Sequence, residues 1–197
     1  MHAGSASLRR GGAVTPLEPD LPGERPFLTD GPRSFALIRR GGRLAVRERD
    51  RDAAARAPRP SVPHFPVNPA WRFDARFEPY DPPRRSPVGS VAGTADAEIF
   101  SGAVVFVHAG GEHRLDAIAE RGETDPWIVF GDATNGRETY GGGRFVYVPP
   151  PREGRTVLDF NRAYNPPCVF SAYSTCPLPL PRNRLPFRVE AGEKTPS

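Results

Sequence analysis

Proline interrupts this chain so often that it leaves little room for long helices. The 197 residues include 25 prolines and 20 glycines, and only the segment 50–57 (DRDAAARA) is a continuous run of good helix formers. Pro58 and Pro60 follow that run directly. Proline removes a backbone donor and clashes with the preceding helical turn, and so short a run cannot bury an apolar stripe. Apart from one helical turn there, the chain is expected to fold from strands, turns and loops.

The segment 71–78 carries the clearest strand pattern. Apolar residues, three of them aromatic, occupy its odd positions, and charged residues occupy its even positions. This alternation is typical of a strand with one buried face, and the prolines at 79, 82 and 83 are expected to end it. Residues 35–49 predict a hairpin around the pair Gly41-Gly42. Further strands are predicted at 99–108, 112–118, 127–130, 144–148 and 156–161, with an edge strand at 185–190.

Short strands separated by turns predict an all-β fold, arranged as an antiparallel β-sandwich or a small β-barrel. Prolines concentrate again between residues 164 and 186, so this stretch is expected to form a long proline-rich loop over the sheet. Residues 1–25 show no apolar period and are predicted as a disordered tail. Residues 26–197 are predicted as a single β-rich domain.

The net charge of +4 originates in the N-terminal part of the chain. Residues 1–60 hold 12 arginines against 7 acidic residues, whereas the rest holds 15 basic residues against 16 acidic ones. A nucleic-acid surface would favour a basic face with interleaved aromatic residues, so no nucleic-acid partner is expected. The longest apolar run, 103–107, is too short to span a bilayer, and no secretory segment follows Met1. These features predict a cytoplasmic protein without a membrane partner.

Six stretches of the chain carry a specific pattern. They are 65–71 (FPVNPAW), 132–144 (DATNGRETYGGGR), 159–168 (DFNRAYNPPC), 175–179 (TCPLP), 183–185 (NRL) and 190–194 (EAGEK). The pattern resembles that of the DUF1684 family, a bacterial and archaeal family of unknown function, over about residues 34–194. The chain lacks the tryptophan- and leucine-rich N-terminal segment that members usually carry. The resemblance implies a shared fold and a set of special positions, but no substrate, cofactor or catalytic residue.

The turn at 132–144 concentrates polar groups around a glycine run. Asp132, Thr134 and Tyr140 precede three glycines, and Arg144 follows them. Glycines let backbone N–H groups approach an anion closely, and an arginine can bind a carboxylate or phosphate through two hydrogen bonds. In the alternative interpretation, the glycines serve turn geometry alone and Asp132 caps its own backbone.

The loop 164–176 supplies a second candidate group. It contains Cys168 and Cys176 together with Tyr164 and Asn165. The cysteines and histidines do not have the close spacing of a zinc site, so no metal is predicted. A nucleophilic thiol in this loop would need a neighbouring base. In the alternatives, the two cysteines pack as small apolar residues or close the loop as a disulfide.

Three functions fit these patterns. The sequence favours a domain that binds a small anionic or polar molecule in a pocket where the 132–144 turn meets the 164–176 loop, with Arg144 as the anion anchor. The second is an enzyme in which His64, Asp132 or a cysteine does acid-base or nucleophilic chemistry. The third is a structural or protein-interaction module, in which both segments are only scaffolding and asparagines such as Asn161 and Asn165 satisfy backbone groups of the loop. The residues expected to contact a ligand are Asp132, Thr134, Tyr140, Arg144, Asn161, Tyr164, Asn165, Cys168 and Cys176.

Overall fold

The computed structural model describes residues 6–10, 13–17, 19, 26–53, 60–119 and 125–197. The chain divides into two compact units, residues 1–59 and 60–197. The boundary falls inside the range 26–197 that the sequence predicts to be one domain. Strands dominate both units, which confirms the predicted all-β fold.

The first unit contains two small antiparallel sheets, one of strands β1 and β2 and one with the order β3-β4-β5. Gly41 and Gly42, with φ of 55° and 76°, form the turn between β4 and β5 and confirm the predicted hairpin. β1 and β2 lie in the range predicted as a disordered tail, and most of the rest of that range lies outside the described residues, as do residues 54–57 of the predicted helical turn. The bounds are β1 Ala6–Arg10, β2 Ala13–Leu17, β3 Leu28–Asp30, β4 Arg33–Arg40 and β5 Arg43–Asp50.

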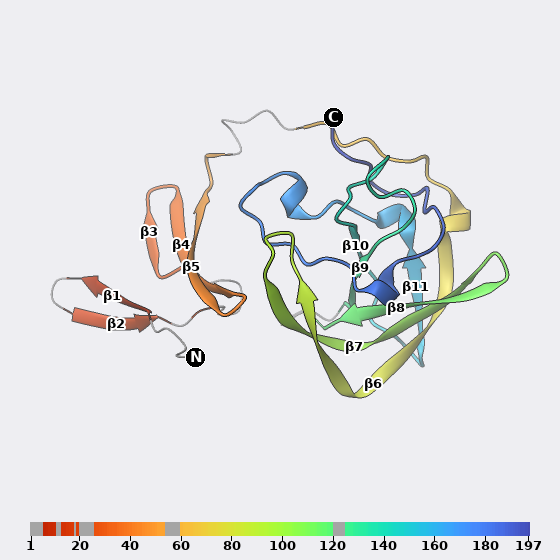
Figure 1. Cartoon of the computed structure of the whole chain (residues 1–197), viewed down its shortest axis with the longest axis horizontal. Coiled ribbons are helices and arrows are strands. Elements are labelled where there is room, and N and C mark those ends of the chain that lie inside the picture. Colours follow the sequence, from red (N-terminus) through yellow and green to blue (C-terminus); the bar gives the residue numbers. More distant parts are fainter. Residues whose placement is uncertain (1–5, 11–12, 18, 20–25, 54–59, 120–124) are drawn as a thin grey trace. The chain divides into compact units, whose positions relative to one another are not determined.

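The second unit is built on a six-stranded antiparallel sheet with the strand order β10-β9-β8-β7-β6-β11. The long strands β6 and β7 bend strongly, so the sheet curves into a half-barrel (Figure 1). Of the two predicted architectures, the curved sheet is nearer to the small barrel, but β10 and β11 lie at its two edges and the sheet stays open. The bounds are β6 Arg72–Gly89, β7 Ala95–His108, β8 Gly111–Ile118, β9 Trp127–Phe130, β10 Arg144–Tyr147 and β11 Arg155–Asp159.

The prolines of β6 do not end the strand, contrary to the sequence prediction. Pro79 pairs with Gly102 of β7, the register then shifts, and pairing resumes between Arg84 and Phe100. Proline cannot donate to a sheet ladder, and a bulge is one of the few positions in a sheet where this costs little. The bulge takes residues 80–83 out of the ladder, and the strand continues to Gly89.

At β9 and β10 both faces of the half-barrel sheet are buried. Successive residues of a strand point to opposite faces, and Phe130 of β9 belongs to one core cluster while Val129 belongs to the other. β10 divides in the same way between Val146 and Phe145. A sheet buried on both faces needs a covering layer on each.

The C-terminal segment supplies covering residues to both faces, which confirms the predicted proline-rich loop. Phe160 and Ala163 pack in the first cluster, Cys176 packs in the second, and Val189 and Ala191 return to the first. Besides coil, this segment contains the 3-10 turns η3 (Phe160–Arg162), η4 (Pro167–Val169) and η5 (Pro181–Asn183); η2 (Pro69–Trp71) precedes β6.

Backbone hydrogen bonds hold both ends of this segment. At its start, Tyr164 and Phe145 exchange hydrogen bonds of 2.9 and 3.0 Å along the edge of β10. At its end, the Lys194 N–H donates to the Pro63 carbonyl at 2.8 Å and the Ser197 N–H to the Ser61 carbonyl at 3.3 Å. The segment therefore closes over the sheet and returns to the beginning of the unit.

The predicted edge strand at 185–190 is wrong. These residues are all described and none of them belongs to a strand, although Arg184 just before them forms a bridge with Gly131. The carbonyl of Val189 instead accepts a hydrogen bond from the buried Arg144 side chain. A guanidinium group thus takes the place of a neighbouring strand as the donor.

Asn183 joins β8 to β9 where their backbone pairing is minimal. The two strands share one paired position, Ile118 with Trp127. The Asn183 amide accepts from the Asp116 N–H at 2.8 Å and donates to the carbonyls of Asp116 and Val129, each at 2.9 Å. One side chain therefore satisfies three buried backbone groups of the sheet.

We expect Asn183→Leu to lower the free energy of unfolding of the second unit by about 3 kcal/mol, because three buried backbone groups lose their partner. Urea unfolding followed by tryptophan fluorescence measures this loss, since both tryptophans lie in this unit. Asn161→Leu is the matched control. Asn161 also binds backbone, that of Asn68, but at an exposed position where water replaces the bonds, so its loss is expected below about 1 kcal/mol. Equal losses would contradict the role of Asn183.

Candidate functional site

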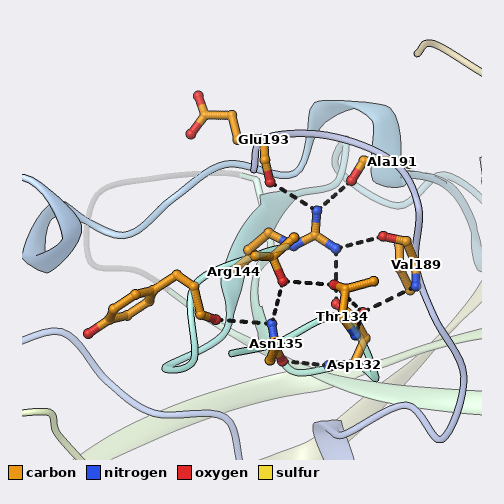
Figure 2. A network of polar contacts seen from close by, with 9 residues as sticks. Asp132, Thr134, Asn135, Arg144, Val189, Ala191 and Glu193 are labelled. Carbon is orange, nitrogen blue, oxygen red and sulfur yellow. Dashed lines mark hydrogen bonds and ion pairs between the residues drawn. The ribbon is translucent and has the colours of Figure 1, made fainter. Parts of the chain in front are cut away.

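Asp132 is the centre of a buried polar network at the end of β9 (Figure 2). Its Oδ1 accepts from the backbone N–H of Thr134 at 2.8 Å, from the Thr134 hydroxyl at 2.6 Å and from the Val189 N–H at 3.2 Å. Its Oδ2 accepts from Arg144 at 2.9 Å. The carboxylate therefore ties the turn to β10 and to the C-terminal segment.

Arg144 is fully buried and its two terminal nitrogens each have two protein partners. One nitrogen donates to the carbonyls of Ala191 and Glu193, and the other to Asp132 Oδ2 and the Val189 carbonyl (Figure 2). Burial lowers the pKa of the guanidinium, and the Asp132 carboxylate opposes that shift. Of the three guanidinium nitrogens, Nε has no hydrogen-bond partner among the described residues. This geometry favours the alternative in which Arg144 is part of the scaffold.

The turn between Asp132 and Arg144 closes on itself through residues that the sequence analysis did not single out. Asn135 accepts from the Asp132 N–H at 2.7 Å and donates to the Thr139 hydroxyl at 2.9 Å. The hydroxyls of Thr134 and Thr139 lie 2.7 Å apart. The pair Asn135-Gly136, with Gly136 at φ 76°, is a turn signal that could have identified this closure.

Tyr140 is the residue of the turn that reaches the cysteine loop. The Cys168 thiol donates to the Tyr140 hydroxyl at 3.6 Å, and the Cys168 N–H donates to Cys176 Sγ at 3.2 Å. Neither cysteine is in a disulfide; Cys168 is partly exposed and Cys176 is buried. The hydrogen bond with Cys168, followed by burial, raises the pKa of Tyr140 to about 12. The two segments predicted to meet are therefore in contact at a hydroxyl and two sulfur atoms.

Asn165 and His64 lie on either side of Glu193. The Asn165 N–H donates to Glu193 Oε2 at 2.7 Å, and the buried Asn165 side chain donates to the Lys194 carbonyl at 2.7 Å. His64 Nε2 lies 3.9 Å from Glu193 Oε1, and its Nδ1 lies 2.9 Å from the Val62 carbonyl. Glu193 was missed from the sequence as a partner of both residues, because nothing in its spacing points to either.

The other two candidates lie apart from these contacts. Asn161 bonds to the backbone of Asn68, with both hydrogen bonds at 3.0 Å, and to the Asp159 side chain. The Tyr164 ring stacks on Tyr147, with ring centroids 6.2 Å apart and planes at 7°. The nine candidate residues therefore divide between a buried network, a tyrosine–cysteine cluster and separate structural contacts.

The described residues hold neither a cluster of candidate metal ligands nor a helix that could span a membrane. No group of three or more His, Cys, Asp or Glu side chains that could hold a metal ion occurs among the described residues. Across the same residues, no helix has the length and apolar character needed to cross a bilayer.

Comparison with known proteins places the second unit in a family. The fold is similar to the solution NMR structure of an uncharacterised protein of Haloarcula marismortui, with a TM-score of 0.57 and 27% sequence identity over 68% of this chain and 76% of that one. No curated protein matches the chain. The model of the protein family of unknown function DUF1684 matches residues 60–194, a range that starts at the first residue of the second unit. The chain belongs to the DUF1684 family.

Proposed function

We propose that the DUF1684 unit binds a small polar molecule where the 132–144 turn meets the 164–176 loop. The observation that carries this proposal is the contact between the Tyr140 hydroxyl and the Cys168 thiol, 3.6 Å apart, on two side chains that are both partly exposed. A hydroxyl and a thiol, one from each segment, can both face a ligand there. Small-molecule sites typically contain a small number of polar groups that converge on the ligand in this way.

The chemistry of these groups favours a neutral polar ligand over an anion. Arg144, the residue first considered as an anion anchor, has its terminal nitrogens bound to Asp132 and to backbone carbonyls. With a pKa of about 12, the Tyr140 hydroxyl stays protonated at neutral pH and can both donate and accept a hydrogen bond. A hydroxyl of this kind matches an amide, carbonyl or alcohol group of a ligand.

Exposed aromatic residues of the same loop support this proposal. Phe170 is 48% exposed and Tyr173 is 92% exposed, and both lie between the two cysteines. Large exposed aromatic side chains on a constrained loop supply contact area at a low entropic cost. They suit a ligand with a flat apolar part beside its polar group.

Tyr140→Phe tests the proposal because it removes only the hydroxyl. Equilibrium dialysis against a mixture of cell metabolites, with detection by mass spectrometry, is expected to show a molecule that the unmodified protein enriches. Its enrichment should fall about two- to tenfold in Tyr140→Phe, the loss of one hydrogen bond. Tyr147→Phe, the same deletion on β10, should retain it. Enrichment of no molecule, or equal enrichment by Tyr140→Phe, would refute the proposal.

A further inference from the structure

Cys168 and Cys176 lie within reach of a covalent bond. Cys176 Sγ is 3.2 Å from the Cys168 backbone nitrogen. Since the N–Cα bond is about 1.46 Å, this sulfur lies within about 4.7 Å of the Cys168 Cα. In a disulfide the two Cα atoms are only about 4.4–6.8 Å apart and both sulfurs lie between them, so each sulfur must come close to the Cα of its partner, as Cys176 Sγ does here. The Cys168 sulfur is turned toward Tyr140, and rotation of its side chain is the movement that pairing requires.

We propose that Cys168 and Cys176 form a reversible disulfide by thiol–disulfide exchange with an oxidised low-molecular-weight disulfide such as glutathione disulfide. The Cys168 thiolate attacks one sulfur of the oxidant, which forms a mixed disulfide and releases one thiolate. The Cys176 thiolate then attacks the Cys168 sulfur and releases the second. The two cysteine thiols are oxidised, the oxidant is reduced to two thiols, and the protons of Cys168 and Cys176 go to those thiols.

The order of attack follows from exposure. Cys168 is partly exposed at the surface, whereas Cys176 is 6% exposed and packs in the second core cluster. A dissolved disulfide therefore meets Cys168 first, and Cys176 is placed to resolve the mixed disulfide.

The disulfide would change the site as well as the sulfur chemistry. It closes the loop that carries Phe170 and Tyr173, and it draws the Cys168 sulfur away from the Tyr140 hydroxyl. The hydroxyl is then left free for another partner. The disulfide does not depend on the ligand proposed above, because both thiols and their separation are properties of the protein alone.

Alkylation after oxidation tests the exchange. The reduced full-length protein is incubated with glutathione disulfide, quenched with acid, treated with N-ethylmaleimide and weighed by mass spectrometry. The expected product carries no alkyl group and no glutathionyl group. Cys176→Ser should stop at a mixed disulfide on Cys168, and Cys168→Ser should react at least about tenfold more slowly because its remaining thiol is buried. Two alkylated cysteines in the unmodified protein, or a mixed disulfide that never resolves, would overturn the proposal.

The pKa of Tyr140 provides a second measurement, which would not change if the two cysteines only packed as apolar side chains. The hydrogen bond with Cys168 is the largest cause of its raised pKa, so oxidation should lower that pKa from about 12 toward the ordinary value. Tyrosine labelled with carbon-13 at Cζ reports this by NMR titration, with Tyr147 as the internal reference. An unchanged Tyr140 pKa in the oxidised protein would contradict the movement of the sulfur. Since no ligand is present, failure here leaves the binding proposal standing, and failed ligand enrichment leaves this one standing.

Discussion

Arg144→Met is expected to lower the free energy of unfolding of the second unit by about 3–5 kcal/mol. The substitution keeps most of the side-chain volume but leaves the buried Asp132 carboxylate without its cation. It also leaves the carbonyls of Val189, Ala191 and Glu193 without a donor. Removal of one partner of a buried ion pair costs this much because the remaining charge is desolvated and unpaired. Urea unfolding followed by tryptophan fluorescence measures the effect.

Two further variants separate this effect from the loss of a positive charge in general. Arg188→Met removes a partly exposed arginine that pairs with Glu138 and Glu190, and it should cost less than about 1 kcal/mol. Asp132→Asn combined with Arg144→Met should cost less than the sum of the two single variants, because no unpaired charge remains. If Arg144→Met and Arg188→Met were equally stable, the buried network would not be a principal source of stability.

Gly192→Ala is expected to lower the free energy of unfolding of the second unit by about 3 kcal/mol or more. Gly192 has φ of 76°, a conformation that costs a residue with a Cβ about 1–2 kcal/mol. A Cβ there would lie 2.5 Å from the Ala163 carbonyl oxygen and 2.8 Å from that of Phe160. Either the backbone must shift or η3 must move.

Gly136→Ala is a close control for the same measurement. Gly136 has the same φ of 76°, but a Cβ there would meet nothing within 4 Å. Its loss should therefore be limited to the backbone strain of about 1–2 kcal/mol. The difference between the two variants isolates the steric contact. A difference near zero would mean that the backbone around Gly192 shifts easily and that its close packing against η3 contributes little to stability.

Local sequence patterns were enough to predict most strands. Residues 127–130 were predicted as a strand, and β9 has these bounds, because a short apolar run between turn residues has few other outcomes. β10 and β11 differ from their predicted ranges by one or two residues. The hairpin of β4 and β5 followed from its glycine pair.

Residue types alone could not predict that β6 would continue past its prolines or that Arg144 would be buried. Pro79 was expected to end a strand, but a bulge after it lets β6 continue. Arg144 was expected to face a ligand, but the C-terminal segment folds over it and buries it. Both outcomes depend on long-range contacts, which a local pattern does not contain. The sequence predicted that the two segments meet, but not that Tyr140 and Cys168 are the residues in contact.

The return of Ser197 to Ser61 makes the second unit a candidate for circular permutation. Domains whose ends lie close together tolerate new connectivity, because a short linker can join the original ends without strain. New ends could be opened at the turn of Ala109 and Gly110 between β7 and β8, where the backbone has positive φ at both residues. Because its ends lie close together, the unit could also be inserted into a surface loop of a host protein, with both connections at neighbouring positions of that loop.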